Sequence, residues 1–308
     1  MGFLMLQCSS NNKSLRFGQA LSFNTGKKNQ TFSEPRYTIA PKLHSLKQDT
    51  VSFGEKHGTN TVSHDLIKQQ GLKQLNDEIL EQPLVLQKLL NEGCPPGLKI
   101  PSSGSSEPIL VVAIGSSLNA ASTFKNELEA FSGKKFELKT PEDIIQHLDR
   151  NQKTPWHSAI VISQSGESGN VVQAAKALAN KVPGLQIVTL TNSQDSTLAR
   201  TYKNNFNISA GEEKSVPATK SMTATMLSLL LLAQKIGQQE SEAKKVSSGL
   251  DNIPPKTQET LQLQSNIHAF AQAMKPPFPT LLISKGSLCN ILPEAKLKLQ
   301  DSSYAASS

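Results

Sequence analysis

The chain has 308 residues and a formal net charge of +7 at pH 7, a length that allows one large or two ordinary domains with hydrophobic cores. Residues 1–60 hold eight Lys and Arg against three Asp and Glu, so +5 of this charge lies there and only +2 in the other 248 residues. Because that remainder has no basic stripe interleaved with aromatic residues, the composition argues against a nucleic-acid partner.

The three cysteines, Cys8, Cys94 and Cys289, lie far apart, with no CxxC motif and no histidine at ligand spacing. They predict neither a disulfide framework nor a metal site, and they favour a reducing compartment such as the cytoplasm. The longest apolar run, residues 226–233, is far too short for a membrane span. We therefore expect a cytoplasmic protein without a membrane partner.

The first part of the chain predicts a leader, a helical segment and a linker. Residues 1–60 are rich in Asn, Ser, Lys and Gln and show little periodicity, so we expect them to be disordered or loosely ordered. From 61 to 92, leucine and isoleucine recur at three- and four-residue spacing, which predicts a helical lead-in that Pro83 divides. Residues 93–107 hold three prolines and three glycines without periodicity, which indicates a linker.

Residues 108–238 alternate short apolar strands with helices. Each predicted strand is apolar throughout, which is typical of a parallel sheet covered by helices on both faces. The expected strands cover 109–114, 136–138, 159–162, 185–190 and 206–208, and the expected helices cover 119–131, 141–148, 170–179, 196–202 and 222–236. The sequence thus predicts an α/β domain, a three-layer αβα sandwich around a five-stranded parallel sheet.

A helical connector and a second α/β unit are expected after this domain. Residues 239–275 show helical patterns over 239–250 and 257–274, which the pair Pro254-Pro255 should separate. Within 276–308, an apolar strand at 280–284, a Gly-Ser turn and a helix at 291–299 follow one another. Because one strand and one helix cannot bury both faces of a sheet, this segment reads as only the start of a second unit.

Hydroxyl-rich loops follow three of the apolar segments. The loop 163–168 (Ser-Gln-Ser-Gly-Glu-Ser) joins a buried strand to a helix, and clusters of Ser, Thr and Gly recur at 115–117 and 214–219. A helix N-terminus favours an anion, and the ligands of open α/β sheets bind at the carboxyl ends of the strands. The loops therefore predict a phosphate site for a hydroxyl-rich ligand. Simple N-capping by serine is the alternative for any single loop.

In these loops and in the segments around them, the sequence resembles the sugar isomerase (SIS) domains, and more closely the isomerase half of the glutamine–fructose-6-phosphate aminotransferases. The resemblance runs from about residue 75 to residue 304 and keeps order and spacing. Five segments carry it: Asp77–Pro83, Gly115–Asn119, Ser163–Ser168, Gly211–Lys220 and Glu294–Asp301. It implies the SIS fold and binding of a hexose 6-phosphate, fructose 6-phosphate or glucosamine 6-phosphate, without metal or organic cofactor.

The resemblance also implies which residues form the site. The expected substrate-binding residues are Ser116, Ser117, Ser163, Gln164, Ser165, Ser168, Val216 and Thr219. The expected catalytic residues are Lys298, for ring opening or proton handling, Asp301, where the family has its glutamate base, and Glu294 in the same segment. At the catalytic end, Asp301 is one methylene shorter than that glutamate. In the third loop, Ala218 stands where the family has a serine, so one hydroxyl contact is lost or supplied otherwise.

Two parts of the aminotransferases have no counterpart in this sequence, namely the glutaminase domain and most of the second SIS domain. We therefore expect no ammonia source within the chain, and we predict binding ahead of catalysis. Three readings stay open: an isomerase or aminating enzyme completed by other chains, a non-catalytic phosphosugar sensor, and a truncated inactive fragment. The family and the apolar helix at 222–236 also lead us to expect a homodimer.

Overall fold

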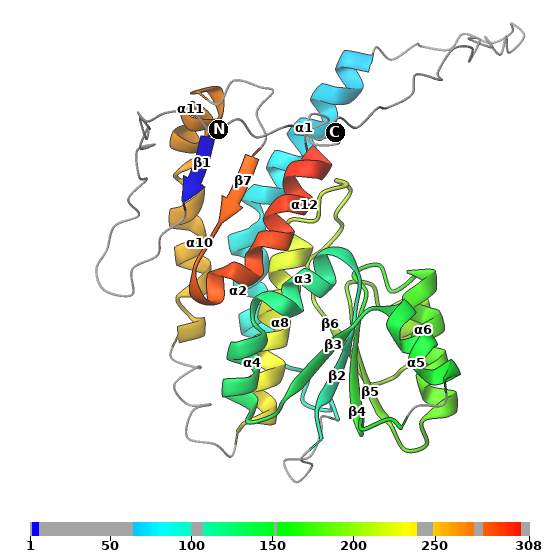
Figure 1. Cartoon of the computed structure of the whole chain (residues 1–308). Helices are drawn as coiled ribbons and strands as arrows, with labels where there is room; N and C mark the ends of the chain where they lie inside the picture. The colour runs from blue at the N-terminus through cyan, green and yellow to red at the C-terminus, as the bar shows by residue number, and fades with distance from the viewer. Residues whose placement is uncertain are drawn as a thin grey trace, which may run out of the picture.

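A five-stranded parallel sheet forms the centre of the molecule (Figure 1). The structure is a computed structural model that describes residues 2–5, 64–99, 107–150, 153–238, 249–273 and 280–302. The strands are β2 (Ile109–Val112), β3 (Phe136–Lys139), β4 (Ser158–Ile162), β5 (Gln186–Thr191) and β6 (Asn205–Asn207), in the order β3-β2-β4-β5-β6. The expected αβα sandwich with its five parallel strands is confirmed.

The order of the strands reverses between β2 and β4. Val111 of β2 lies opposite Leu138 of β3 on one side and opposite Ile160 of β4 on the other. The chain therefore leaves β2 in one direction and returns to extend the sheet in the other. In sheets of this kind, ligands bind outside the carboxyl ends of the strands at this reversal, which here are the loops after β2 and β4.

Helices cover both faces of the sheet (Figure 1). On one face lie α3 (Gly115–Thr123), α4 (Lys125–Ser132) and α8 (Lys220–Ile236), and on the other lie α5 (Pro141–Asp149) and α6 (Gly169–Lys181). Neighbouring residues of β2 belong to different cores: Ile109 and Val111 pack with α8, whereas Leu110 and Val112 pack with α5 and α6. Alternating side-chain directions on a strand buried on both faces explain its continuous apolar sequence.

The apolar helix α8 is a core element. Thirteen of its 17 residues are buried, and it packs against α2, α3 and α4. Its apolar surface, which was one reason to expect a homodimer, is thus covered within the domain. No helix in the described ranges combines the length and the apolar character needed to cross a membrane.

The lead-in forms two helices, α1 (His64–Leu80) and α2 (Gln82–Glu92), which separate at Glu81. Pro83 lies in the first turn of α2, so the predicted division is confirmed. There its missing N–H costs nothing, because the first N–H groups of a helix have no partner within the helix. The helix α2 packs against α8 and against α10 (Ile253–Leu261), which ties the lead-in to the sheet domain.

Two helix predictions were wrong in detail. The single helix expected over 119–131 is two helices, α3 and α4, which meet at Phe124, where φ is −105° and ψ is 15°. Thr123 donates its hydroxyl hydrogen to the carbonyls of Asn119 (2.7 Å) and Asn290 (3.3 Å), so a contact far away in sequence accompanies this break. The single helix expected over 257–274 is also two helices, α10 and α11 (Gln264–Ala273), and Pro254 and Pro255 lie in the first turn of α10, just after a turn at residues 251–252.

The strand and helix expected near residue 280 are present as β7 (Thr280–Ile283) and α12 (Leu292–Ser302), with the 3-10 helix η1 (Gly286–Ile291) between them. β7 pairs in parallel with β1 (Gly2–Met5), a strand that the expected leader was not predicted to contain. The remainder of the leader, the first three residues of the lead-in (61–63) and residues 239–248 of the helix expected over 239–250 lie outside the described residues, whereas residues 249–250 are helical.

The turn between α4 and β3 is organised around the carboxylate of Glu129. It accepts hydrogen bonds from Lys125 Nζ (2.8 Å), Lys135 Nζ (2.9 Å) and the backbone N–H of Phe136 (3.0 Å). Burial raises the pKa of Glu129, but the three donors outweigh it and lower the pKa to about 2. The carboxylate therefore stabilises the fold in its charged form.

We expect Glu129→Gln to lower the free energy of unfolding at pH 7 by about 1–3 kcal/mol, because the amide removes the charge that two lysines share. Since the folded-state pKa lies below the ordinary value of 4.5, this contribution is complete at neutral pH and is lost as pH falls towards 2. Denaturant titration at pH 7 and pH 3 should show the difference from the parent shrinking by about half. Glu259→Gln, in an exposed ion pair with Lys256, is the control and should change little. An equal loss at both pH values would contradict the prediction.

Candidate functional site

The loop after β4 is a tight turn held from the inside by serine side chains. Gly166 has φ +66°, and its N–H donates to the carbonyl and to the hydroxyl of Ser163 at 3.0 and 3.1 Å. Ser163 is buried, and its Oγ lies 3.0 Å from Oγ of Ser168. Ser163 and Ser168 thus connect the two ends of the turn.

The same loop is anchored to α7 (Thr197–Thr201). The carboxylate of Glu167 accepts hydrogen bonds from the hydroxyl and the backbone N–H of Thr197, both at 2.7 Å. The hydrogen bond from the Thr197 hydroxyl lowers the pKa of Glu167 most, and the hydrogen bond from the Thr197 backbone N–H lowers it further. On the other side of the turn, Gly166 lies so close to Ser196 that a Cβ atom on the glycine would be 2.2 Å from the Ser196 hydroxyl oxygen. The turn is fixed by contacts on both sides.

The turn leads into the N-terminus of α6, where an anion is favoured. Ser168 is the N-cap residue, but its side chain makes no capping hydrogen bond, because it faces Ser163 instead. Ser165 is exposed, and its hydroxyl accepts a hydrogen bond from the backbone N–H of Glu167 at 3.2 Å. The loop therefore presents a hydroxyl next to the positive end of a 13-residue helix.

The loop after β2 opens α3 and brings a cation to the site. Gly115 has φ +57°, and Ser116 and Ser117 follow it as half-buried residues in the first turn of α3. The ammonium of Lys298 donates to the Ser116 hydroxyl at 3.1 Å. A residue of α12 thus reaches the carboxyl end of β2 across 182 positions of sequence.

A buried polar cluster docks α12 on α3. The carboxylate of Glu294 is almost fully buried and accepts a hydrogen bond from Nδ2 of Asn119 at 2.8 Å. Its other oxygen lies 2.7 Å from Nζ of Lys298. Glu294 therefore holds Lys298, which follows it by four residues on α12, in place beside Ser116.

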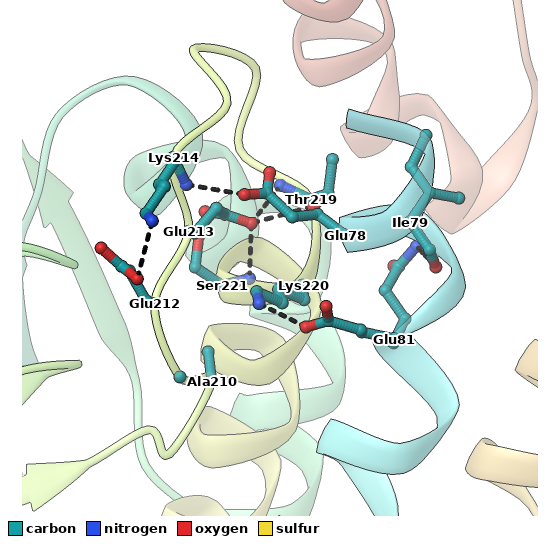
Figure 2. A network of polar contacts seen from close by, with 12 residues as sticks. Glu78, Ile79, Glu81, Ala210, Glu212, Glu213, Lys214, Thr219, Lys220 and Ser221 are labelled. Atoms are coloured by element: carbon teal, nitrogen blue, oxygen red, sulfur yellow. Dashed lines mark hydrogen bonds and ion pairs between the residues drawn. The ribbon is translucent and has the colours of Figure 1, made fainter. Parts of the chain in front are cut away.

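The third hydroxyl-rich segment, residues 211–219 (called loop 211–219 below), is closed by the carboxylate of Glu213. This carboxylate accepts hydrogen bonds from the N–H (2.8 Å) and hydroxyl (2.9 Å) of Thr219, and also from the N–H (3.2 Å) and hydroxyl of Ser221 (Figure 2). Val216 lies at the tip of the loop and is 87 % exposed. Glu213 was not predicted, although a carboxylate shortly before the start of a helix is a common N-terminal capping signal.

The three loops border a cavity of about 120 Å³ that is open to solvent at the start of α8. Ser116, Ser117, Gln164, Glu213, Ser215, Val216, Ala218, Ser221, Met222 and Thr225 line it. The sequence did not predict the lining residues of α8, because they belong to the same helix face as the core.

The structure brings four of the predicted binding residues to this cavity: Ser116, Ser117, Gln164 and Val216. Ser163, Ser165 and Ser168 belong to the loop of Gln164 but are not among the described lining residues. Thr219 is not among the described lining residues either, and its hydroxyl donates to Glu213, which does line the cavity. The predicted binding set therefore divides into residues that line the cavity and residues that shape its loops.

The predicted catalytic residues also divide. Lys298 donates a hydrogen bond to Ser116, which lines the cavity, and Glu294 accepts one from Asn119 on the same helix as Ser116. Asp301 is exposed in the last turn of α12 and is not among the described residues that line the cavity.

A larger hollow of about 420 Å³ lies along the edge strand β6. Its lining residues are Lys88, Glu92, Gly93, Pro95, Gln194, Phe206, Asn207 and Ser209, and none of them is a predicted site residue. We place the candidate site at the smaller cavity, because that cavity combines hydroxyls, a nearby cation and the reversal point of the sheet.

Comparisons with curated proteins find relatives that match part of their length. Glutamine–fructose-6-phosphate aminotransferase [isomerizing] of Aliivibrio fischeri is 28 % identical over 203 residues, which cover 64 % of this chain and 33 % of the relative. The enzyme of the same name from Chlamydia muridarum is 29 % identical over 238 residues, which cover 74 % of this chain and 38 % of the relative. This chain therefore spans little more than a third of these relatives.

Solved structures share the fold. The C-terminal domain of glucosamine-fructose-6-phosphate aminotransferase from Francisella tularensis aligns with a TM-score of 0.66 at 24 % identity, covering 79 % of this chain and 70 % of that one. Tagatose-6-phosphate ketose/aldose isomerase from Escherichia coli aligns with a TM-score of 0.56 at 16 % identity, covering 75 % and 64 %. Residues 105–235 match the SIS domain family. The parallel sheet, its loops and this match together identify residues 105–235 of the chain as a SIS domain.

Proposed function

We propose that this chain binds a sugar phosphate, a hexose 6-phosphate such as fructose 6-phosphate or glucosamine 6-phosphate, in the cavity between its three loops. One observation carries the proposal. Hydroxyl-bearing loops after β2 and β4 meet at the reversal point of the sheet; α6 begins directly after the second loop, and Lys298 donates a hydrogen bond to Ser116 in the first. The names of the relatives, which refer to fructose 6-phosphate, support the same class of ligand.

The phosphate is proposed to bind to the loop of residues 163–168. Ser165 is exposed there, and Ser163 and Ser168 connect the two ends of the turn just before α6. The sugar then extends towards Ser116 and Ser117, where the Lys298 ammonium faces its oxygens. In this arrangement hydroxyl groups donate hydrogen bonds to the phosphate, and the Lys298 ammonium lies at the sugar end.

Isomerisation of the bound sugar phosphate is the second candidate function. The ion pair of Lys298 with Glu294 beside the cavity favours it, because an aldose–ketose shift needs groups that handle protons near the carbonyl carbon. The exposed position of Asp301 favours binding alone. A coupled assay of wild-type turnover with fructose 6-phosphate distinguishes the two, since turnover would support the second candidate.

Several further properties belong to the same proposal. We propose a domain division into lead-in (61–92), linker (93–107), SIS domain (108–238), connector (239–275) and C-terminal unit (276–308), together with assembly as a homodimer. A location in the cytoplasm and an amino-sugar substrate are likewise proposals. Sedimentation at several protein concentrations, with and without hexose phosphate, tests the homodimer.

We expect Ser165→Ala to weaken the binding of glucosamine 6-phosphate by roughly ten- to hundred-fold, since a hydrogen bond to a charged group contributes about 1.5–3 kcal/mol. Isothermal titration should show this loss for both hexose 6-phosphates, and glucosamine without a phosphate should bind neither protein measurably. Ser193→Ala removes a similarly exposed hydroxyl from the segment between β5 and α7, outside the loop of residues 163–168, and it should bind like the parent. Absence of binding by the parent would refute the proposed function.

A further inference from the structure

The end of α1 contributes a buried carboxylate to the loop that lines the cavity. Glu78 is 4 % exposed, and its carboxylate accepts a hydrogen bond from the backbone N–H of Lys214 at 2.7 Å (Figure 2). It also accepts one from the backbone N–H of Ser215 at 3.2 Å. Gln74 adds a third hydrogen bond from within α1, at 3.3 Å. Two consecutive amides of loop 211–219 are thus held by a residue 136 positions earlier in the sequence.

Glu78 holds these amides as a charged group. Burial tends to raise the pKa of Glu78, but the hydrogen bonds that it accepts from the loop and from Gln74 hold its pKa below the ordinary value. Hydrogen bonds to an ionised acceptor are roughly twice as strong as those between neutral groups. A neutral amide at this position offers one acceptor oxygen and, in place of the other, an NH₂ group that faces a donor.

A second carboxylate of the lead-in holds the other end of the loop. Lys220, which follows loop 211–219 and begins α8, has a side chain only 5 % exposed, and its Nζ lies 2.5 Å from the carboxylate of Glu81 (Figure 2). Glu81 is the residue that separates α1 from α2. A buried ammonium needs a compensating charge, so the break between the two helices places that charge where α8 begins.

Between these two anchors lies one wall of the cavity. Ser215, whose N–H Glu78 binds, lines the cavity. Val216 and Ala218, which come after it in the loop, also line the cavity. Val216 at the tip is exposed and has little packing to fix its position. The shape of this wall therefore depends on the contacts at its two ends, in addition to the closure by Glu213.

We propose that the lead-in helices are part of the sugar-phosphate site, with Glu78 and Glu81 acting as positioning residues that hold loop 211–219 in the form that lines the cavity. This inference rests on the proposed function. It also gives a role to the segment Asp77–Pro83, which is one of the five segments that carry the resemblance although the proposal places none of its residues against the ligand. The ligand and the lead-in are then coupled: hexose phosphate that orders the loop also stabilises the end of α1.

The test combines binding with local hydrogen exchange in the full chain. We expect Glu78→Gln to raise the exchange rate of the Lys214 and Ser215 amides at least ten-fold without ligand, while amides of β4 and α8 keep their rates. Affinity for glucosamine 6-phosphate should fall roughly ten-fold by isothermal titration. Glu212→Gln is the matched control, because Glu212 is in the same loop but is exposed and, among the described residues, pairs with the Lys214 side chain at 3.1 Å. It should match the parent in both measurements.

Glu81→Gln provides an independent second variant, because it leaves the contacts of Glu78 in place. We expect it to raise exchange at Ser221 and to lower the affinity by a smaller factor. The inference is overturned if the parent binds hexose phosphate and both variants equal it in affinity and exchange. It is also overturned if exchange rises equally in β4, since that marks general destabilisation. If the parent binds no hexose phosphate, the proposed function fails, whereas the loop exchange of ligand-free Glu78→Gln still decides the positioning role.

Discussion

Gly166→Ala should weaken hexose phosphate binding by roughly a hundred-fold and lower the free energy of unfolding by about 2–4 kcal/mol, combining backbone strain with overpacking. Gly166 has φ +66°, a conformation that costs an alanine about 1–2 kcal/mol. The added Cβ would also lie 2.2 Å from Oγ and 2.4 Å from Cβ of Ser196. Either Ser196 or the turn must move, and Ser196 is the residue whose hydroxyl caps α7.

Isothermal titration with glucosamine 6-phosphate and denaturant unfolding measure the two effects separately. Gly169→Ala is the control, because Gly169 is the first residue of α6, lies in the same segment and has open space around the position of a Cβ atom. That variant should fold and bind like the parent, within about 0.5 kcal/mol in unfolding free energy. Parent-like affinity of Gly166→Ala would show that the exact shape of the turn does not matter for binding.

The sheet could be predicted from the sequence because burial on both faces makes each strand a continuous apolar run. The break at Phe124 could not, because no proline or glycine marks it, and the contact beside it joins Thr123 to Asn290, 167 positions away. Pro254 and Pro255 led the prediction to begin the following helix at residue 257, whereas α10 begins at Ile253. Two adjacent prolines suit a loop or a first helical turn equally well, and only the packing of α10 on α2 distinguishes the two.

The place of the site could be predicted because the carboxyl ends of parallel strands meet at one edge of the sheet. The individual roles could not. Thr219 appeared to be a ligand-binding hydroxyl, but it hydrogen-bonds to Glu213. Glu78 and Glu81 act on residues 136 and 139 positions away, and no local pattern of charge or periodicity indicates such contacts. Local motifs locate loops, whereas tertiary hydrogen bonds decide which side chains face the cavity.

Lys298→Met should produce a loss of both stability and binding that the control Lys296→Met does not share. The methionine keeps most of the length of the side chain but removes the charge that faces the buried carboxylate of Glu294 at 2.7 Å. Leaving one member of a buried ion pair uncompensated costs about 3–5 kcal/mol, and partial exposure of Lys298 reduces the expected cost here to about 2–3 kcal/mol. The Ser116 hydroxyl also loses its donor, so affinity for hexose phosphate should fall at least ten-fold.

A second substitution separates the two losses. In Lys298→Met combined with Glu294→Gln, the buried group is neutral and keeps an amide oxygen for the hydrogen bond from Asn119. We expect the double variant to recover at least half of the lost unfolding free energy, because no unpaired charge remains buried. Its affinity should stay low, since the cation beside Ser116 is still absent. Recovery of binding together with stability would mean that Lys298 only docks α12 on α3, whereas stability without binding assigns its ammonium to the ligand.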